Sequence, residues 1–158
     1  ENFAVGNDGG VIVDMSPMSG VTRDESGRYV IDAGARLLDV YTTVDQQYGV
    51  TLPGGSCANV GAGGHITGGG YGMLSRLYGL TVDYLDAVEL VYVTADGRAE
   101  TIVASQDSTD PDEQELLWGH AGGGGGKFEC VDGAHVLVVD YYRDPEGERY
   151  TPYDREDH

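Results

Sequence analysis

The sequence predicts an α+β fold in which helices flank a mixed or antiparallel sheet. Two observations carry this prediction. Short apolar runs bounded by turn residues alternate with helical apolar stripes, and an Asp-Gly dipeptide joins two strand-like runs. The length of 158 residues, 40% of them apolar, is enough for one domain with a buried core.

The first elements follow from two apolar runs and one helical stripe. Residues 11–14 and 28–32 are expected to form strands, with a turn at 25–27 before the second. A stripe of apolar side chains at helical spacing then predicts a helix that stops at Gly49. The stripe consists of Leu37, Tyr41, Val44 and Tyr48. We expect it to cover the sheet and to take no part in a site.

Further strands are expected in the second half of the chain. Residues 87–94 form a strongly apolar strand pattern, the Asp-Gly turn lies within 95–98, and 99–104 form the return strand. A last strand is expected over 135–142, ahead of a charged tail.

A second helix is marked by its start signals. Asp110 can cap it, Pro111 suits the first helical position, and Glu113 stands three residues after the cap. The helix must end by Gly122.

The charge balance excludes two classes of partner. The chain has 27 Asp and Glu against 9 Lys and Arg, a net charge of −18. Nucleic acids and anionic membranes are bound by basic surfaces, so neither is expected as a partner. No apolar run approaches the ~20 residues of a membrane span, and no signal segment leads the chain. The compartment stays open between cytoplasmic and secreted.

The 26 glycines concentrate in residues 54–72 and 122–126. The second cluster fails as a phosphate loop, because Ala121 and Phe128 stand where glycine and a hydroxyl residue are required. The first fails as a dinucleotide fingerprint, since Ile66 or Met73 occupies its last position. No histidine or cysteine spacing indicates a metal site, and two cysteines allow at most one disulfide.

The segment from Pro53 to Gly72 therefore needs another explanation. Glycine permits positive φ and lets backbone N–H groups approach a ligand without obstruction by Cβ atoms. A flat ring with an attached pyrophosphate needs both properties. Binding through neutral backbone donors also suits a chain in which Lys and Arg are scarce.

These residues closely resemble one known family. The matching stretches are LPGGSCANVGAGGHITGGGYGMLSRLYGL (residues 52–80), ELLWGHAGGGGG (115–126) and Phe128. They are similar to the berberine bridge enzyme-like FAD-linked oxidases, which share the PCMH-type FAD-binding fold with vanillyl-alcohol oxidase. The resemblance implies that residues 1–128 are part of the second, larger subdomain of that fold. Residues 129–158 match poorly and are expected to form a strand and an acidic tail.

The resemblance also implies a cofactor and its ligands. The cofactor is FAD, bonded at its C6 carbon to Cys57 as a 6-S-cysteinyl link, with a short helix beginning at His65. In the family, a second covalent bond to FAD comes from a histidine upstream of the position matching Glu1. His65 is not the counterpart of that histidine. The implied cofactor contacts are Pro53, Gly54, Gly55, Ser56, Cys57, Val60, Gly61, Gly63, Gly64, His65, Gly68, Tyr71, Gly72, Val82 and Phe128.

The implied reaction is an oxidation in which a sugar, glycoside or alcohol gives a hydride to the flavin and O₂ accepts the electrons. No residue of this chain is identified as the catalytic base. Alternatives remain at three positions: Cys57, His65 and Tyr71 serve the cofactor or are ordinary packing residues. The alternative for the whole chain is a non-catalytic fragment or an engineered cofactor-fold module.

Overall fold

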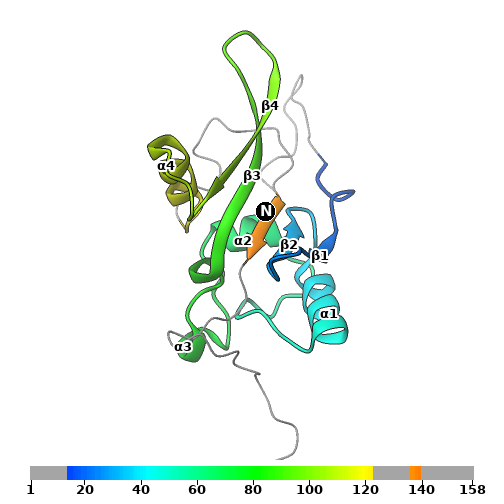
Figure 1. Ribbon diagram of the computed structural model, residues 1–158. Coiled ribbons are helices and arrows are strands. Elements are labelled where there is room, and N and C mark those ends of the chain that lie inside the picture. The colour runs from blue at the N-terminus through cyan, green and yellow to red at the C-terminus, as the bar shows by residue number, and fades with distance from the viewer. Residues whose placement is uncertain (1–13, 123–135, 140–158) are drawn as a thin grey trace, which may run out of the picture.

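The structure, a computed structural model, describes residues 14–122 and 136–139. Their strands form one antiparallel sheet in the order β1-β2-β5-β3-β4 (Figure 1). The strands are β1 (Val21–Arg23), β2 (Tyr29–Asp32), β3 (Leu85–Val93), β4 (Ala99–Ser105) and β5 (Val136–Val139). The predicted α+β class and antiparallel sheet are confirmed.

Two hairpins make up most of this sheet. β1 and β2 form one, and β3 and β4 form the other, turning at Gly97 with a φ of 81°. β5 lies between β2 and β3 and pairs with both. The sheet therefore takes its middle strand from residues 136–139, while the domain boundary expected at residue 128 stays a prediction.

The helices are α1 (Leu37–Tyr48), α2 (Ala62–Thr67), α3 (Ser75–Tyr78) and α4 (Pro111–His120), with a 3₁₀ helix η2 at Thr81–Tyr84. α1 ends as predicted at Gly49, which adopts the left-handed conformation with a φ of 68°. α4 begins as predicted, because the Asp110 carboxylate accepts a hydrogen bond of 2.9 Å from the Asp112 N–H.

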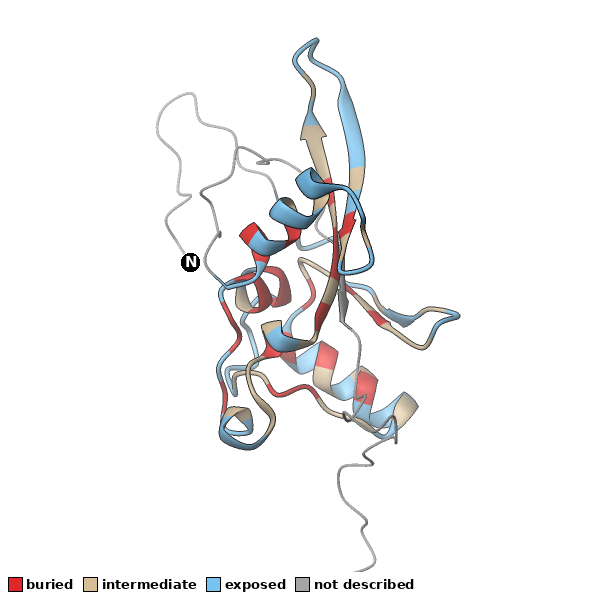
Figure 2. Cartoon of the chain, turned by 60° about the vertical axis from the view of Figure 1, so that its left-hand side comes forward, coloured by how far each residue is buried: buried red, intermediate tan, exposed pale blue. Residues whose placement is uncertain are grey.

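The core lies on one face of the sheet, beneath the helices (Figure 2). Alternate strand residues point into it, among them Ile31, Val88 and Leu90, none of which is accessible to solvent. α1 adds Leu37, Val40 and Val44, and α2 adds Ile66. The buried stripe of α1 thus uses Val40, while Tyr41 and Tyr48 are only half-buried.

The structure corrects three expectations and leaves others untested. β1 was not expected, the short helix starts at Ala62 instead of His65, and α3 and η2 fall in a segment without predicted elements. The strand expected at 11–14 has only Asp14 among the described residues, where it lies outside any strand. Among the described helices, none has the length and apolar character that crossing a bilayer requires.

Candidate cofactor site

The glycine-rich segment, residues 52–72, runs from α1 through α2 toward α3, and we call it the glycine loop. One side of it is fastened to the start of α1. The N–H groups of Leu37 and Leu38 donate hydrogen bonds of 3.0 and 3.1 Å to the carbonyls of Val60 and Ala58. Arg36, the residue before α1, makes no side-chain cap. The loop therefore supplies the acceptors that the first turn of the helix lacks.

Gly55 is held at both of its peptide groups by side chains from two helices. The Tyr41 hydroxyl of α1 donates to the Gly55 carbonyl at 2.6 Å. The Gly55 N–H donates to Nε2 of His65, on α2, at 2.9 Å. Nε2 accepts this bond only when it carries no proton, so the imidazole is held neutral with its proton on Nδ1.

Burial supports these protonation states. Burial raises the pKa of Tyr41 to about 12, so its hydroxyl keeps the proton that it donates. Burial also lowers the pKa of His65 from its usual value, which favours the neutral ring. The two side chains are therefore matched to the Gly55 carbonyl and N–H that they meet.

Thr81 of η2 ties the two ends of the glycine loop together. Its fully buried hydroxyl lies 3.0 Å from the Pro53 carbonyl oxygen and 2.9 Å from that of Gly70. Its backbone N–H also donates a hydrogen bond of 3.0 Å to the Gly70 carbonyl. Gly70 has a φ of 71°, a conformation that favours glycine. The loop thus closes on itself at this point.

Some glycines of the loop are required by the chain's own packing. A Cβ added at Gly72 would lie 1.8 Å from the Gly54 carbonyl oxygen, and one added at Gly63 would lie 2.8 Å from the Ala33 Cβ. A Cβ at Gly54 would meet the Tyr41 hydroxyl at 2.6 Å. These three positions are close approaches of backbone to the rest of the chain.

Gly64 has no such explanation. It lies inside α2, where glycine costs about 1 kcal/mol relative to alanine, yet an added Cβ would meet nothing within 4 Å. It is exposed, as are the residues from Ser56 to Gly61. The open space beside Gly64 is therefore a place that a side chain would fill and a ligand can approach.

Exposed backbone donors and one thiol accompany this open space. Within residues 14–122 and 136–139, no acceptor meets the N–H groups of Ser56, Cys57, Ala58, Gly61 and Gly64. Cys57 is an exposed free cysteine. The surface can therefore offer amide hydrogens to the oxygen and nitrogen acceptors of an isoalloxazine ring, and an exposed thiol lies beside them. The residues fit FAD.

The predicted site residues, apart from Val82 in η2 and Phe128, lie within the glycine loop, and they differ in exposure. Ser56, Cys57, Val60, Gly61, Gly64, Gly68 and Tyr71 are exposed; Gly54, Gly55, His65 and Val82 are half-buried; Pro53, Gly63 and Gly72 are buried. Phe128 lies outside the described residues. Tyr71, with 76% of its surface exposed, does not pack in the described core. Cys57 is likewise exposed and does not belong to the described core.

Two residues that position the loop were not expected from the sequence. Tyr41 was assigned to a purely structural stripe, but its hydroxyl bonds the loop. Thr81 carried no motif signal. A polar atom on the apolar stripe of α1 was the available sign for Tyr41, because a hydroxyl turned toward the interior needs an acceptor.

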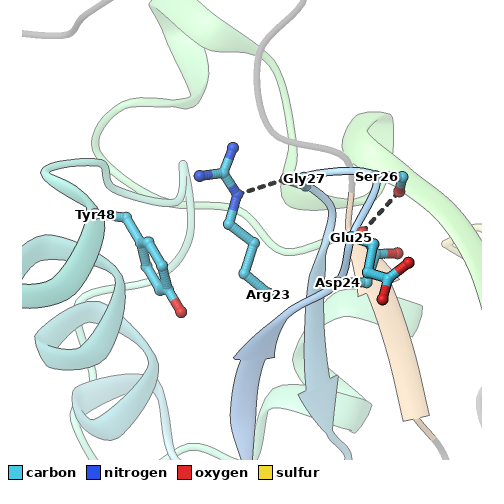
Figure 3. A pocket seen from close by; sticks show the side chains of 6 residues that line it. All are labelled: Arg23, Asp24, Glu25, Ser26, Gly27 and Tyr48. Atoms are coloured by element: carbon cyan, nitrogen blue, oxygen red, sulfur yellow. Dashed lines mark hydrogen bonds between the residues drawn. The ribbon is translucent and has the colours of Figure 1, made fainter.

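A separate surface pocket lies at the turn between β1 and β2 (Figure 3). It is lined by Arg23, Asp24, Glu25, Ser26, Gly27 and Tyr48, none of which belongs to the glycine loop. Nε of Arg23 donates to the Gly27 carbonyl at 3.0 Å, and the guanidinium packs over the Tyr29 and Tyr48 rings. These contacts explain Arg23 as a structural residue.

The described residues contain no cluster of metal ligands. No group of three or more His, Cys, Asp or Glu side chains there could hold an ion. His120 is buried at the end of α4, where its Nδ1 lies 2.8 Å from the Leu116 carbonyl oxygen.

Comparison with known proteins agrees with the geometry of the loop. The family model described as "FAD binding domain" matches residues 2–102. Aclacinomycin-N/aclacinomycin-A oxidase of Streptomyces galilaeus is 47% identical over 121 residues, covering 76% of this chain and 22% of the relative. Berberine bridge enzyme-like 4 of Arabidopsis thaliana is 38% identical over 132 residues, covering 82% and 23%.

Two solved structures extend this comparison. A glycopeptide hexose oxidase complexed with teicoplanin has a TM-score of 0.75 and 44% identity, covering 90% of this chain and 28% of its own. Glucooligosaccharide oxidase from Acremonium strictum, whose structure concerns its 6-S-cysteinyl, 8α-N1-histidyl FAD, has a TM-score of 0.64 and 31% identity, covering 79% and 24%.

The chain belongs to the FAD binding domain family, with the PCMH-type fold of the FAD-linked oxidases. Its relatives are berberine bridge enzyme-like and related oxidases. The chain spans about a fifth to a quarter of the length of these curated relatives.

Proposed function

We propose that this chain holds FAD in an oxidase that takes a hydride from a sugar, a glycoside or a related alcohol and passes the electrons to O₂. The observation that carries the proposal is the exposed face of the glycine loop. There a free thiol, free backbone N–H groups and the unfilled space beside Gly64 occur together. The names of the relatives, which include oxidases of aclacinomycin and of a glycopeptide hexose, support the substrate class.

In this proposal each part of the loop has a distinct task. Cys57 bonds the flavin, as the cysteinyl FAD named for glucooligosaccharide oxidase suggests by analogy. The free N–H groups from Ser56 to Gly64 meet flavin oxygen and nitrogen atoms. Tyr71, on the exposed side, faces the bound molecules. FAD supplies the hydride acceptor, and this chain supplies its binding and orientation.

Attachment at Cys57 would follow a balanced oxidation. Cys57 loses its thiol proton and bonds through Sγ to carbon C6, whose hydrogen leaves as a proton. The two electrons released pass through FAD to O₂, which takes up two protons and becomes H₂O₂. The same acceptor then serves substrate oxidation.

The experiment is a turnover measurement on the full-length protein. Mono- and oligosaccharides and a glycosylated aromatic compound are added anaerobically, and bleaching of the flavin absorbance is followed. Air is then admitted, and H₂O₂ is measured. We expect bleaching by at least one sugar or glycoside and about one H₂O₂ per substrate oxidised. A protein with bound flavin that no such compound bleaches would be a cofactor holder without this chemistry.

A further inference from the structure

We propose that Tyr41 and His65 are positioning residues, which clamp Gly55 from both sides and so hold Cys57 where the flavin can bond to it. This inference rests on the proposed function, because it concerns the cysteine that the proposed function assigns to FAD. It adds a role for Tyr41, which lies on a helix whose stripe otherwise packs on the sheet.

The backbone is held by hydrogen bonds on both sides of Cys57. Two residues before it, Gly55 has its carbonyl fixed by Tyr41 and its N–H fixed by His65. One residue after it, the Ala58 carbonyl accepts a hydrogen bond from the Leu38 N–H. The exposed thiol therefore lies on a short span whose two ends are both fastened to α1 or α2.

The contacts of Tyr41 and His65 with the loop are directional as well as close. An added Cβ at Gly55 would lie 2.9 Å from Cε1 of His65, and one at Gly54 would lie 2.6 Å from the Tyr41 hydroxyl. Glycine at both positions lets these side chains reach the backbone. A loop that needed only to be compact would not require a hydroxyl donor on one side and an imidazole acceptor on the other.

A fixed thiol matters because bond formation needs the sulfur close to the reacting carbon and correctly aligned. A mobile span would bring Cys57 to the flavin only part of the time. Removing one hydrogen bond, worth about 1 kcal/mol net, lowers the ratio of the held to the released conformation about fivefold. The clamp therefore acts mainly on the rate of attachment. Its effect on FAD affinity is smaller, because the part of the loop with the free N–H groups of Ala58, Gly61 and Gly64 is fastened by other hydrogen bonds.

The test compares Tyr41→Phe with wild type in the full-length protein. Both are produced without FAD and then mixed with FAD in air. The fraction of the Cys57 peptide that carries flavin is followed by mass spectrometry. We expect attachment to slow twofold to fivefold in Tyr41→Phe, while the dissociation constant for FAD, measured without air, changes less than twofold.

The matched control is Tyr48→Phe. Tyr48 lies on the same helix, but its ring packs edge-on against that of Tyr29, with 5.3 Å between the ring centroids. Within the described residues, no hydrogen bond joins its hydroxyl to the glycine loop, whereas the Tyr41 hydroxyl makes one. The Tyr48→Phe variant should attach FAD at the wild-type rate. Equal slowing in both variants would mean general destabilisation and would overturn the clamp.

The remaining outcomes separate the two proposals. If Tyr41→Phe attaches FAD at the same rate as wild type, the clamp is overturned and the cysteinyl link stands. A wild-type protein that never forms the flavin-bonded Cys57 peptide would overturn the cysteinyl link, and the clamp with it.

Should Tyr41→Phe not fold, hydrogen exchange in the wild type gives the answer. In the FAD-free wild type the Gly55 amide should exchange at least tenfold more slowly than the Ser56 amide, and equal rates would contradict the clamp.

Discussion

At the scale of single residues, the glycines of the loop divide into two kinds. Gly54, Gly63 and Gly72 are needed because other atoms of the chain occupy the space of a Cβ. Gly64 is not, since its surroundings are open. The sequence placed all four in one cofactor segment, but only coordinates separate glycines that serve packing from one that leaves room for a ligand.

This division predicts opposite effects of two substitutions. Gly64→Ala should raise the free energy of unfolding of the FAD-free protein by about 0.5–1 kcal/mol, because alanine favours the helix. It should also weaken FAD binding at least tenfold. Gly72→Ala should lower the free energy of unfolding by about 3 kcal/mol, through overlap with the Gly54 carbonyl. Urea unfolding and FAD titration measure these effects. Unchanged FAD affinity in Gly64→Ala would remove Gly64 from the site.

His65 predicts a pH dependence. Burial holds its pKa in the folded protein below the value of about 6.5 that it has when unfolded. The unfolded state therefore binds more protons in this range, and the contribution of His65 to stability is complete above pH 6.5 and declines as the pH falls below it. His65→Gln, which cannot titrate, should lose less stability than wild type between pH 7.5 and about 5. Thermal unfolding of both proteins across this range checks the prediction, and parallel curves would contradict it.

At the scale of elements, the sequence predicted what local signals encode. α1 was predicted from its apolar period and Gly49, and α4 from Asp110 and Pro111; the helices end at Tyr48 and His120. α2 and α3, with six and four residues, are too short for a periodic signal. The backbone of α2 is held by contacts distant in sequence, such as the hydrogen bond of 2.7 Å from the Ala62 N–H to the Ala35 carbonyl. β1 has three residues and little burial, so it also lacked a pattern.

The cap of α4 gives a test at this scale. Asp110→Ala should lower the free energy of unfolding by about 1 kcal/mol, because the Asp112 N–H loses its acceptor. Asp110→Asn retains a side-chain oxygen and should recover most of this loss. Chemical denaturation of the three proteins gives the comparison. An alanine variant as stable as wild type would show that the cap contributes nothing.

At the scale of the whole molecule, the sheet order and the glycine loop depend on distant parts of the chain. β5 joins the two hairpins although it lies more than 40 residues beyond β3, and no local pattern of strand residues indicates such a partner. The contacts of Tyr41 and Thr81 with the loop are likewise nonlocal. The composition and motif of the glycine loop predicted the family to which the chain belongs. The hydrogen bonds that hold the loop in place could be seen only in the structure.

The central claim is that the glycine loop holds a flavin beside Cys57. The most direct measurement is a peptide map of the full-length protein, purified in air, precipitated with acid and digested. We expect that yellow colour stays with the precipitated polypeptide and that the peptide containing Cys57 carries the added mass of the flavin. A colourless polypeptide with an unmodified Cys57 thiol, from a protein that also takes up no added FAD, would contradict it.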